Sequence, residues 1–171
     1  LADTQIAAFD GAQIRALSNT ALIGLADTQL GALTTTQIAA LSTAQVRALT
    51  ETSIAAFSET QAAALTGAQL QQLSSTALSA LADTQVAAMS TTQISALRSN
   101  QLAALDTADM AEFSSTQIAA LSTTQLRGLS TTNVAALADT QVAALTTTQI
   151  QGLSTSQVAA FDETQIGALT T

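Results

Sequence analysis

The stretch LSTAQVRA at residues 41–48 decides the fold of this chain. Ser42 and Gln45 have the Ser/Thr-x-x-Gln spacing of a capping box, in which each side chain accepts a hydrogen bond from the other residue's backbone N–H. Leu41 and Val46 flank the box at the spacing of a hydrophobic staple, which packs the residue before the N-cap against the fourth helical residue. The octapeptide therefore predicts the start of a new helix.

The same octapeptide pattern runs through all 171 residues. Every eighth residue from Leu1 to Leu169 is large and apolar, and a second apolar series begins at Ile6, with Ala62 as its only small member. The consensus is Leu-(Ser/Thr)-x-Thr-Gln-(Ile/Val/Leu)-Ala-Ala, and no insertion interrupts it. We expect a single continuous repeat array over residues 1–171, with 21 complete octads and a partial one, as a fragment of a longer array.

Three other folds fit the octad poorly. A single long helix turns by about 800° over eight residues, so its apolar stripe would wind around the rod. The apolar runs are far shorter than the roughly 20 residues of a membrane span. A β-solenoid needs β-branched residues at alternate places, whereas this octad groups Gln, Ala, Ala and Leu, which favour helix. We therefore expect an all-α solenoid, a superhelix of about 21 very short helices, one per octad.

A slower rhythm overlies the octads at the fifth place, which Gln normally occupies. The exceptions are Ala21, Ser53, Ala77, Asp109 and Asn133. They are separated by 32, 24, 32 and 24 residues, so the pattern repeats after 56 residues. Two compatible interpretations of this period are duplication of a 56-residue block and an average of about 3.5 octads per superhelical turn. We expect the five exceptions to form one stripe, a candidate contact line for a partner.

The composition excludes several classes of site. The chain has no Cys and no His, so a thiol nucleophile, an imidazole base and a zinc site of the usual kind are excluded. We expect no catalytic residue, no metal and no cofactor. The only basic residues are Arg15, Arg47, Arg98 and Arg127. With a net charge of −8 and only 2% aromatic residues, the chain is not expected to bind nucleic acid.

Most acidic residues stand at or just after a predicted N-cap, where a negative charge stabilises a helix end. Four octads have Ala at the N-cap place, followed by Asp3, Asp27, Asp83 or Asp139. We expect each of these Asp residues to act as the cap or as an anion of the first turn. The only local acidic cluster, Asp106, Asp109 and Glu112, lacks the Gly turn and ligand spacing of a calcium loop and is expected to be a solvated patch.

The octad also predicts which places face the core. Both apolar series and most eighth-place Ala residues should be inside, and third-place residues should be outside. Four octads carry an aromatic residue at the first place, namely Phe9, Phe57, Phe113 and Phe161. We expect these side chains to fill wider gaps in the core rather than to form a ligand site.

Tracts such as LTTTQIAAL at residues 33–41 resemble the Thr-Gln-rich short repeats of very large bacterial proteins that are similar to secreted or surface adhesins. The resemblance covers the whole chain and rests on the repeat pattern rather than on a catalytic signature. It implies a repetitive stalk region at an extracellular or cell-surface location.

These observations favour a non-enzymatic structural solenoid that acts as a rod-like spacer or stalk. Its expected partners are flanking repeats or domains of a longer chain, with protein or surface ligands as further candidates, and neither nucleic acid nor membrane insertion is expected. Two alternatives stay open. Pairs of Thr at the third and fourth places, such as residues 35–36 and 123–124, form an array suited to ice or polysaccharide. The other alternative is a protein-recognition solenoid.

Overall fold

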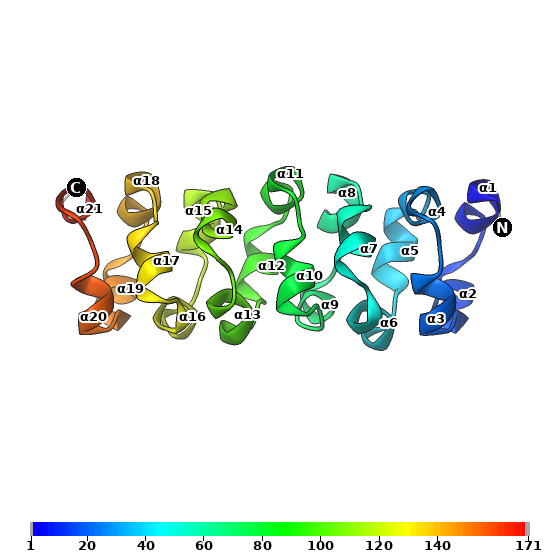
Figure 1. Cartoon of the computed structure of the whole chain (residues 1–171), viewed down its shortest axis with the longest axis horizontal. Coiled ribbons are helices and arrows are strands. Elements are labelled where there is room, and N and C mark those ends of the chain that lie inside the picture. The colour runs from blue at the N-terminus through cyan, green and yellow to red at the C-terminus, as the bar shows by residue number, and fades with distance from the viewer. Residues whose placement is uncertain (1, 170–171) are drawn as a thin grey trace. The chain divides into compact units, whose positions relative to one another are not determined.

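The structure is a computed structural model that describes residues 2–169. In this part of the chain every regular element is a short α-helix, and no strand occurs. The helices belong to two compact units, which are described separately: an N-terminal unit, Leu1–Met89, and a C-terminal unit, Ser90–Thr171. Figure 1 shows the order of the helices along the chain. The prediction of an all-α solenoid with one short helix per octad is confirmed.

The helices are four to six residues long. Those of the N-terminal unit are α1 (Asp3–Ala7), α2 (Gly11–Ala16), α3 (Asn19–Ile23), α4 (Asp27–Gly31), α5 (Thr35–Ala40), α6 (Thr43–Ala48), α7 (Glu51–Ala55), α8 (Glu59–Ala63), α9 (Gly67–Leu70), α10 (Ser75–Ser79) and α11 (Asp83–Ala87). Those of the C-terminal unit are α12 (Thr91–Ser95), α13 (Ser99–Ala103), α14 (Thr107–Glu112), α15 (Ser115–Ala119), α16 (Thr123–Gly128), α17 (Thr131–Ala135), α18 (Asp139–Ala143), α19 (Thr147–Gly152), α20 (Thr155–Val158) and α21 (Glu163–Ala168).

Most helices start at a capping box and end before the next apolar first place; α3, α7, α10 and α17, whose fifth place is neither Gln nor Asp, keep only the bond to the N-cap side chain. At α6, Ser42 Oγ accepts from the backbone N–H of Gln45 at 3.2 Å, and Gln45 Oε1 accepts from the N–H of Ser42 at 2.8 Å. Ser42 has extended backbone angles, as an N-cap requires. The helix ends at Leu49, which is extended again, with its N–H bonded to the carbonyl of Val46. The capping sequence of one octad therefore also terminates the helix of the octad before it.

Helices with Ala at the N-cap keep half of this box. The Ala methyl group cannot accept a hydrogen bond, and no side-chain cap forms at Ala82. Gln85 Oε1 still accepts from the N–H of Ala82 at 2.7 Å. Asp83 is the first helical residue. Of the two roles expected for such Asp residues, the structure therefore shows the first-turn anion and not the N-cap.

Within each unit, a helix packs against the third helix that follows it. In the N-terminal unit α2 contacts α5, and α3 contacts α6, which contacts α9. In the C-terminal unit α13 contacts α16, α16 contacts α19, and α18 contacts α21. Each turn of a unit thus lies on the preceding turn, as the solenoid prediction requires.

The two apolar series form the core of each unit, as predicted, with exceptions near the two ends of the described range. Fully buried members of the second series include Ile38, Leu70 and Ile118. Val158 and Ile166 are 40% and 43% exposed, because no further described turn covers them. At the first places, Phe57, Phe113 and Phe161 are buried, whereas Phe9 is half-buried. Leu1 lies outside the described residues.

The prediction that most eighth-place Ala residues are inside is wrong. In the described part of the chain all of them are half-buried or exposed, and the buried places of the octad are the first, fifth and sixth. Eighth-place residues contact the neighbouring turn instead of the interior: a Cβ added at the third-place Gly11 would lie 3.0 Å from the Cβ of Ala40. Third-place residues lie outside the core, as predicted.

Candidate functional site

The fifth-place Gln is the residue that joins successive turns. Gln69 in α9 is 3% exposed. Its Oε1 accepts from the N–H of Thr66 at 2.7 Å. Its Nε2 donates to the carbonyl oxygens of Ile38 at 2.9 Å and Leu41 at 2.8 Å. These carbonyls lie 31 and 28 residues earlier, so one amide caps its own helix and bonds the preceding turn.

This arrangement recurs in both units. The side-chain Nε2 donates to the carbonyl 28 residues earlier at Gln37, Gln45, Gln61, Gln69, Gln85, Gln125, Gln141, Gln149, Gln157 and Gln165. A fixed separation of 28 residues equals 3.5 octads of eight residues. The hydrogen bonds within each unit therefore agree with about 3.5 octads per superhelical turn.

Only an amide can make both kinds of hydrogen bond at this position. Its oxygen accepts from the N-cap N–H, and its nitrogen donates to carbonyls at the end of a helix in the preceding turn, such as those of Ile38 and Leu41. A carboxylate would satisfy the capping box equally well but has no donor. The sequence interpretation recognised only the cap. A signal for the second role was present, because no fifth place carries Glu although the chain is acidic.

The five fifth-place exceptions differ in their surroundings. Ser53, Ala77 and Asn133 are 4%, 0% and 3% exposed, Asp109 is half-buried, and Ala21 is exposed. Asn133 Nδ2 donates to the carbonyl of Leu105 at 2.8 Å, so this shorter amide still bonds the preceding turn. Ser53 and Ala77 lie on the contacting helices α7 and α10. Whether the five residues contact a partner stays a prediction.

Two residues of the acidic cluster, Asp106 and Asp109, cap the start of helix α14. Asp106 is the N-cap, and its Oδ1 accepts from the N–H groups of Ala108 and Asp109 at 2.8 and 2.9 Å. Asp109 Oδ2 in turn accepts from the N–H of Asp106 at 2.9 Å. The two carboxylates thus build a capping box at the start of a helix. Within residues 2–169 no group of three acidic residues is placed to hold a metal ion.

Three Arg residues occupy the seventh place of their octads, and their partners differ. Arg15 Nε donates to the carbonyl of Ala40 at 3.2 Å, 25 residues later. Arg47 donates to Gln72 Oε1 at 2.5 Å, again 25 residues later. The residue 25 positions after Arg127 is Gly152, which has no side chain. The Arg127 guanidinium makes no hydrogen bond to any residue within the described range.

The fold and the amide-linked turns define the class of protein: a helical repeat solenoid in which each turn contacts only its neighbours along the chain. The chain belongs to the ALTTAQ repeat family, whose model matches residues 6–43, 102–139 and 138–171, together more than half of the chain. The hexapeptides ALTTTQ at residues 32–37 and 144–149 differ from the ALTTAQ of the family name only at their fifth residue. No curated protein and no solved structure matches the chain.

The helices of the described range are all far shorter than a membrane-spanning helix, and none of them could cross a bilayer.

Proposed function

We propose that this ALTTAQ repeat tract is a non-enzymatic spacer in a longer, secreted or surface-located bacterial protein. The observation that carries the proposal is the glutamine hydrogen bond across 28 residues, from Gln69 to Leu41 and at equivalent places in both units. A spacer must keep its length under load and must be extensible by repetition. A turn that bonds to the preceding turn through the same residue each time meets both requirements.

The chemistry of the chain supports the surface location. A chain without Cys does not depend on the redox state of its compartment. Its repeats resemble the Thr-Gln-rich tracts of adhesin-like bacterial proteins.

The acidic side chains favour a structural function. They stand mainly at helix starts, as at Asp106 and Asp162, where they cap a helix and have no evident catalytic role.

Fluorescence energy transfer between two labels tests the spacer. Because the chain has no Cys, Ala2→Cys and Ala159→Cys provide unique attachment sites, both exposed. A spacer predicts one narrow distance distribution that is insensitive to salt, whereas a flexible charged linker gives a broad distribution that changes with salt. The control pair, Ala2→Cys with Ala87→Cys, reports on the N-terminal unit alone. A narrow distribution for the control and a broad one for the long pair would contradict the proposal.

A further inference from the structure

In the C-terminal unit, α16 packs closely on α13, and α19 packs closely on α16. Gly128 of α16 and Gly152 of α19 stand at the eighth place, where most octads have Ala. A Cβ added at Gly128 would lie 3.1 Å from the Cβ of Ser99. A Cβ added at Gly152 would lie 2.9 Å from the Cβ and Cγ2 of Thr123. The two glycines therefore allow this approach and leave the surface above them without side chains.

The result is an open groove of about 550 Å³, lined by Ser99, Thr123, Thr124, Arg127, Gly128 and Gly152. The side chains of Ser99, Thr123, Thr124 and Arg127 make no hydrogen bond to any residue of the described range. Three hydroxyl groups and one guanidinium thus face the groove with their hydrogen-bonding capacity unused.

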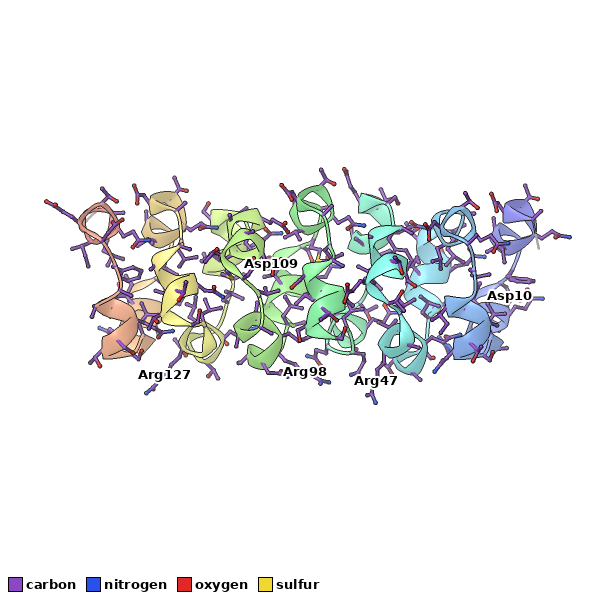
Figure 2. All side chains as sticks on the ribbon, viewed as in Figure 1. Asp10, Arg47, Arg98, Asp109 and Arg127 are labelled. Atoms are coloured by element: carbon purple, nitrogen blue, oxygen red, sulfur yellow. The ribbon has the colours of Figure 1, made fainter. Side chains whose placement is uncertain are left out.

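This face is also the one part of the C-terminal unit with a positive charge. Both Arg residues of the unit, Arg98 and Arg127, lie in the octads of α13 and α16, and Figure 2 shows them reaching out on the same side of the unit. The octads of α13, α16 and α19 contain no acidic residue. The acids of the unit lie elsewhere, at Asp106, Asp109, Glu112, Asp139, Asp162 and Glu163.

A second groove, in the N-terminal unit, shows what this one lacks. It has a volume of about 460 Å³ and is lined by Glu59 among other residues. Two hydroxyls of its lining, those of Ser58 and Thr60, lie 3.0 Å apart and are hydrogen-bonded to each other. Gln85 of this groove bonds the preceding turn. Three of its polar side chains, Ser58, Thr60 and Gln85, are therefore already hydrogen-bonded, and its charged side chain, Glu59, is negative.

We propose that the groove along α13, α16 and α19 binds an acidic polysaccharide, a sugar chain that carries carboxylate or sulfate groups. The planar guanidinium of Arg127 matches a carboxylate or sulfate through two parallel hydrogen bonds. The hydroxyls of Ser99, Thr123 and Thr124 can donate to and accept from sugar hydroxyls. The groove offers none of the aromatic or large aliphatic pockets that anchor a protein partner. This binding function is independent of the spacer function and adds to it.

Titration calorimetry at low ionic strength tests the proposal with four polymers. Sodium alginate supplies carboxylates on sugar, dextran sulfate supplies sulfates on sugar, dextran is neutral, and polyglutamate carries carboxylates on a peptide. The protein variants are Arg127→Gln and Thr124→Val in the groove. Arg47→Gln is the matched control, because Arg47 occupies the same place of its octad but already bonds Gln72. Thermal unfolding verifies that each variant is folded.

We expect alginate or dextran sulfate to bind, with an affinity that falls as salt rises. Arg127→Gln should weaken this binding about tenfold or more, Thr124→Val should weaken it to a smaller extent, and Arg47→Gln should leave it within about twofold. Absence of binding to both charged sugars, equal binding of dextran or polyglutamate, or an equal loss with Arg47→Gln would each overturn the proposal.

Discussion

The side-chain amide of Gln69 lies between the start of its own helix and the carbonyl oxygen of Leu41, to which it donates at 2.8 Å across 28 residues. Its oxygen accepts from the N–H of Thr66 at 2.7 Å. The residue that fixes where a helix begins therefore also fixes where that helix lies on the preceding turn. One buried side chain therefore couples the start of a helix to the packing of that helix on the preceding turn.

Ala77→Gln should stabilise the protein. Ala77 stands at a fifth place without an amide, so neither the N–H of Ser74 nor the carbonyl of Leu49, 28 residues earlier, receives the bond that Gln gives elsewhere. A Gln at this place supplies both partners, and each hydrogen bond contributes about 1 kcal/mol. Urea denaturation should show a higher midpoint for this variant. A lower midpoint would mean that the turn has closed around the small side chain and has no room for the amide.

Two glycines should respond to Ala in opposite ways. Gly152→Ala should destabilise the C-terminal unit by about 1–3 kcal/mol, because the new methyl group would lie 2.9 Å from Thr123. Gly167→Ala should stabilise by up to about 1 kcal/mol, because a Cβ there meets nothing within 4 Å and Ala favours helix. Thermal unfolding of both variants measures the contrast. Stabilisation by both substitutions would show that α16 and α19 are less closely packed than described.

The octad allowed the secondary structure and most of the core to be predicted, because its information is local. The capping box and staple of LSTAQVRA at residues 41–48 specify a helix start through contacts no more than five residues apart. Burial of Leu97 and Ile118 followed from the period alone. The turn length was also accessible, since the exceptions at the fifth place carry its 56-residue period.

The parts that the sequence interpretation missed depend on contacts between turns. The donor role of Gln69 becomes visible only when Leu41 is known to lie beside it, 28 residues away along the chain. The exposure of eighth-place Ala residues depends on how α16 packs on α13, which the octad itself does not state. The groove beside Arg127 arises from Gly152, a residue 25 positions further on that contributes nothing to the repeat pattern.

The pKa of Asp162 should lie below its ordinary value of 3.8, because the N–H of Gln165 donates to its carboxylate at 2.8 Å. The hydroxyl of Thr164 adds a second bond at 2.7 Å. A pKa lowered by folding gives a stabilisation that is present above the unfolded value and is lost as the pH falls through the folded value.

An NMR titration of the Asp162 side chain measures this pKa in the folded protein. Thr164→Val removes one of the two bonds and should move the midpoint upward, toward 3.8. A midpoint at or above 3.8 in the unsubstituted protein would contradict the capping geometry of α21.

Gln69→Glu should separate the two roles of the fifth-place residue. The carboxylate still accepts from Thr66 but cannot donate to Ile38 and Leu41, and it brings a buried charge beside two carbonyl oxygens. We expect a destabilisation of about 3 kcal/mol in urea denaturation. Gln5→Glu is the matched control, because Gln5 is exposed and its Oε1 also caps its own helix, at the N–H of Ala2.

The control should change the free energy of unfolding by no more than about 0.5 kcal/mol. Equal effects of the two substitutions would show that the cap alone explains the Gln at this place, and that its bond to the preceding turn contributes little.

Disulfide formation tests the register of one turn on the next most directly. The Cβ of Ser99 and an ideal Cβ at Gly128 lie 3.1 Å apart, close to the roughly 3.5–4.5 Å between the Cβ atoms of a disulfide. Ser99→Cys with Gly128→Cys creates the only two thiols of the chain. In the control pair, Ser99→Cys with Ala136→Cys, the second thiol occupies the eighth place of the next octad.

After mild oxidation, trypsin cleavage at Arg98 and Arg127 places the two thiols of either pair on separate peptides, and mass spectrometry reports whether these peptides are joined. If the glutamine bonds set the register between turns, the thiols at 99 and 128 should form a disulfide within one molecule. The thiols at 99 and 136 should stay reduced. Joining of the control pair, or no joining of the first pair, would contradict the 28-residue turn.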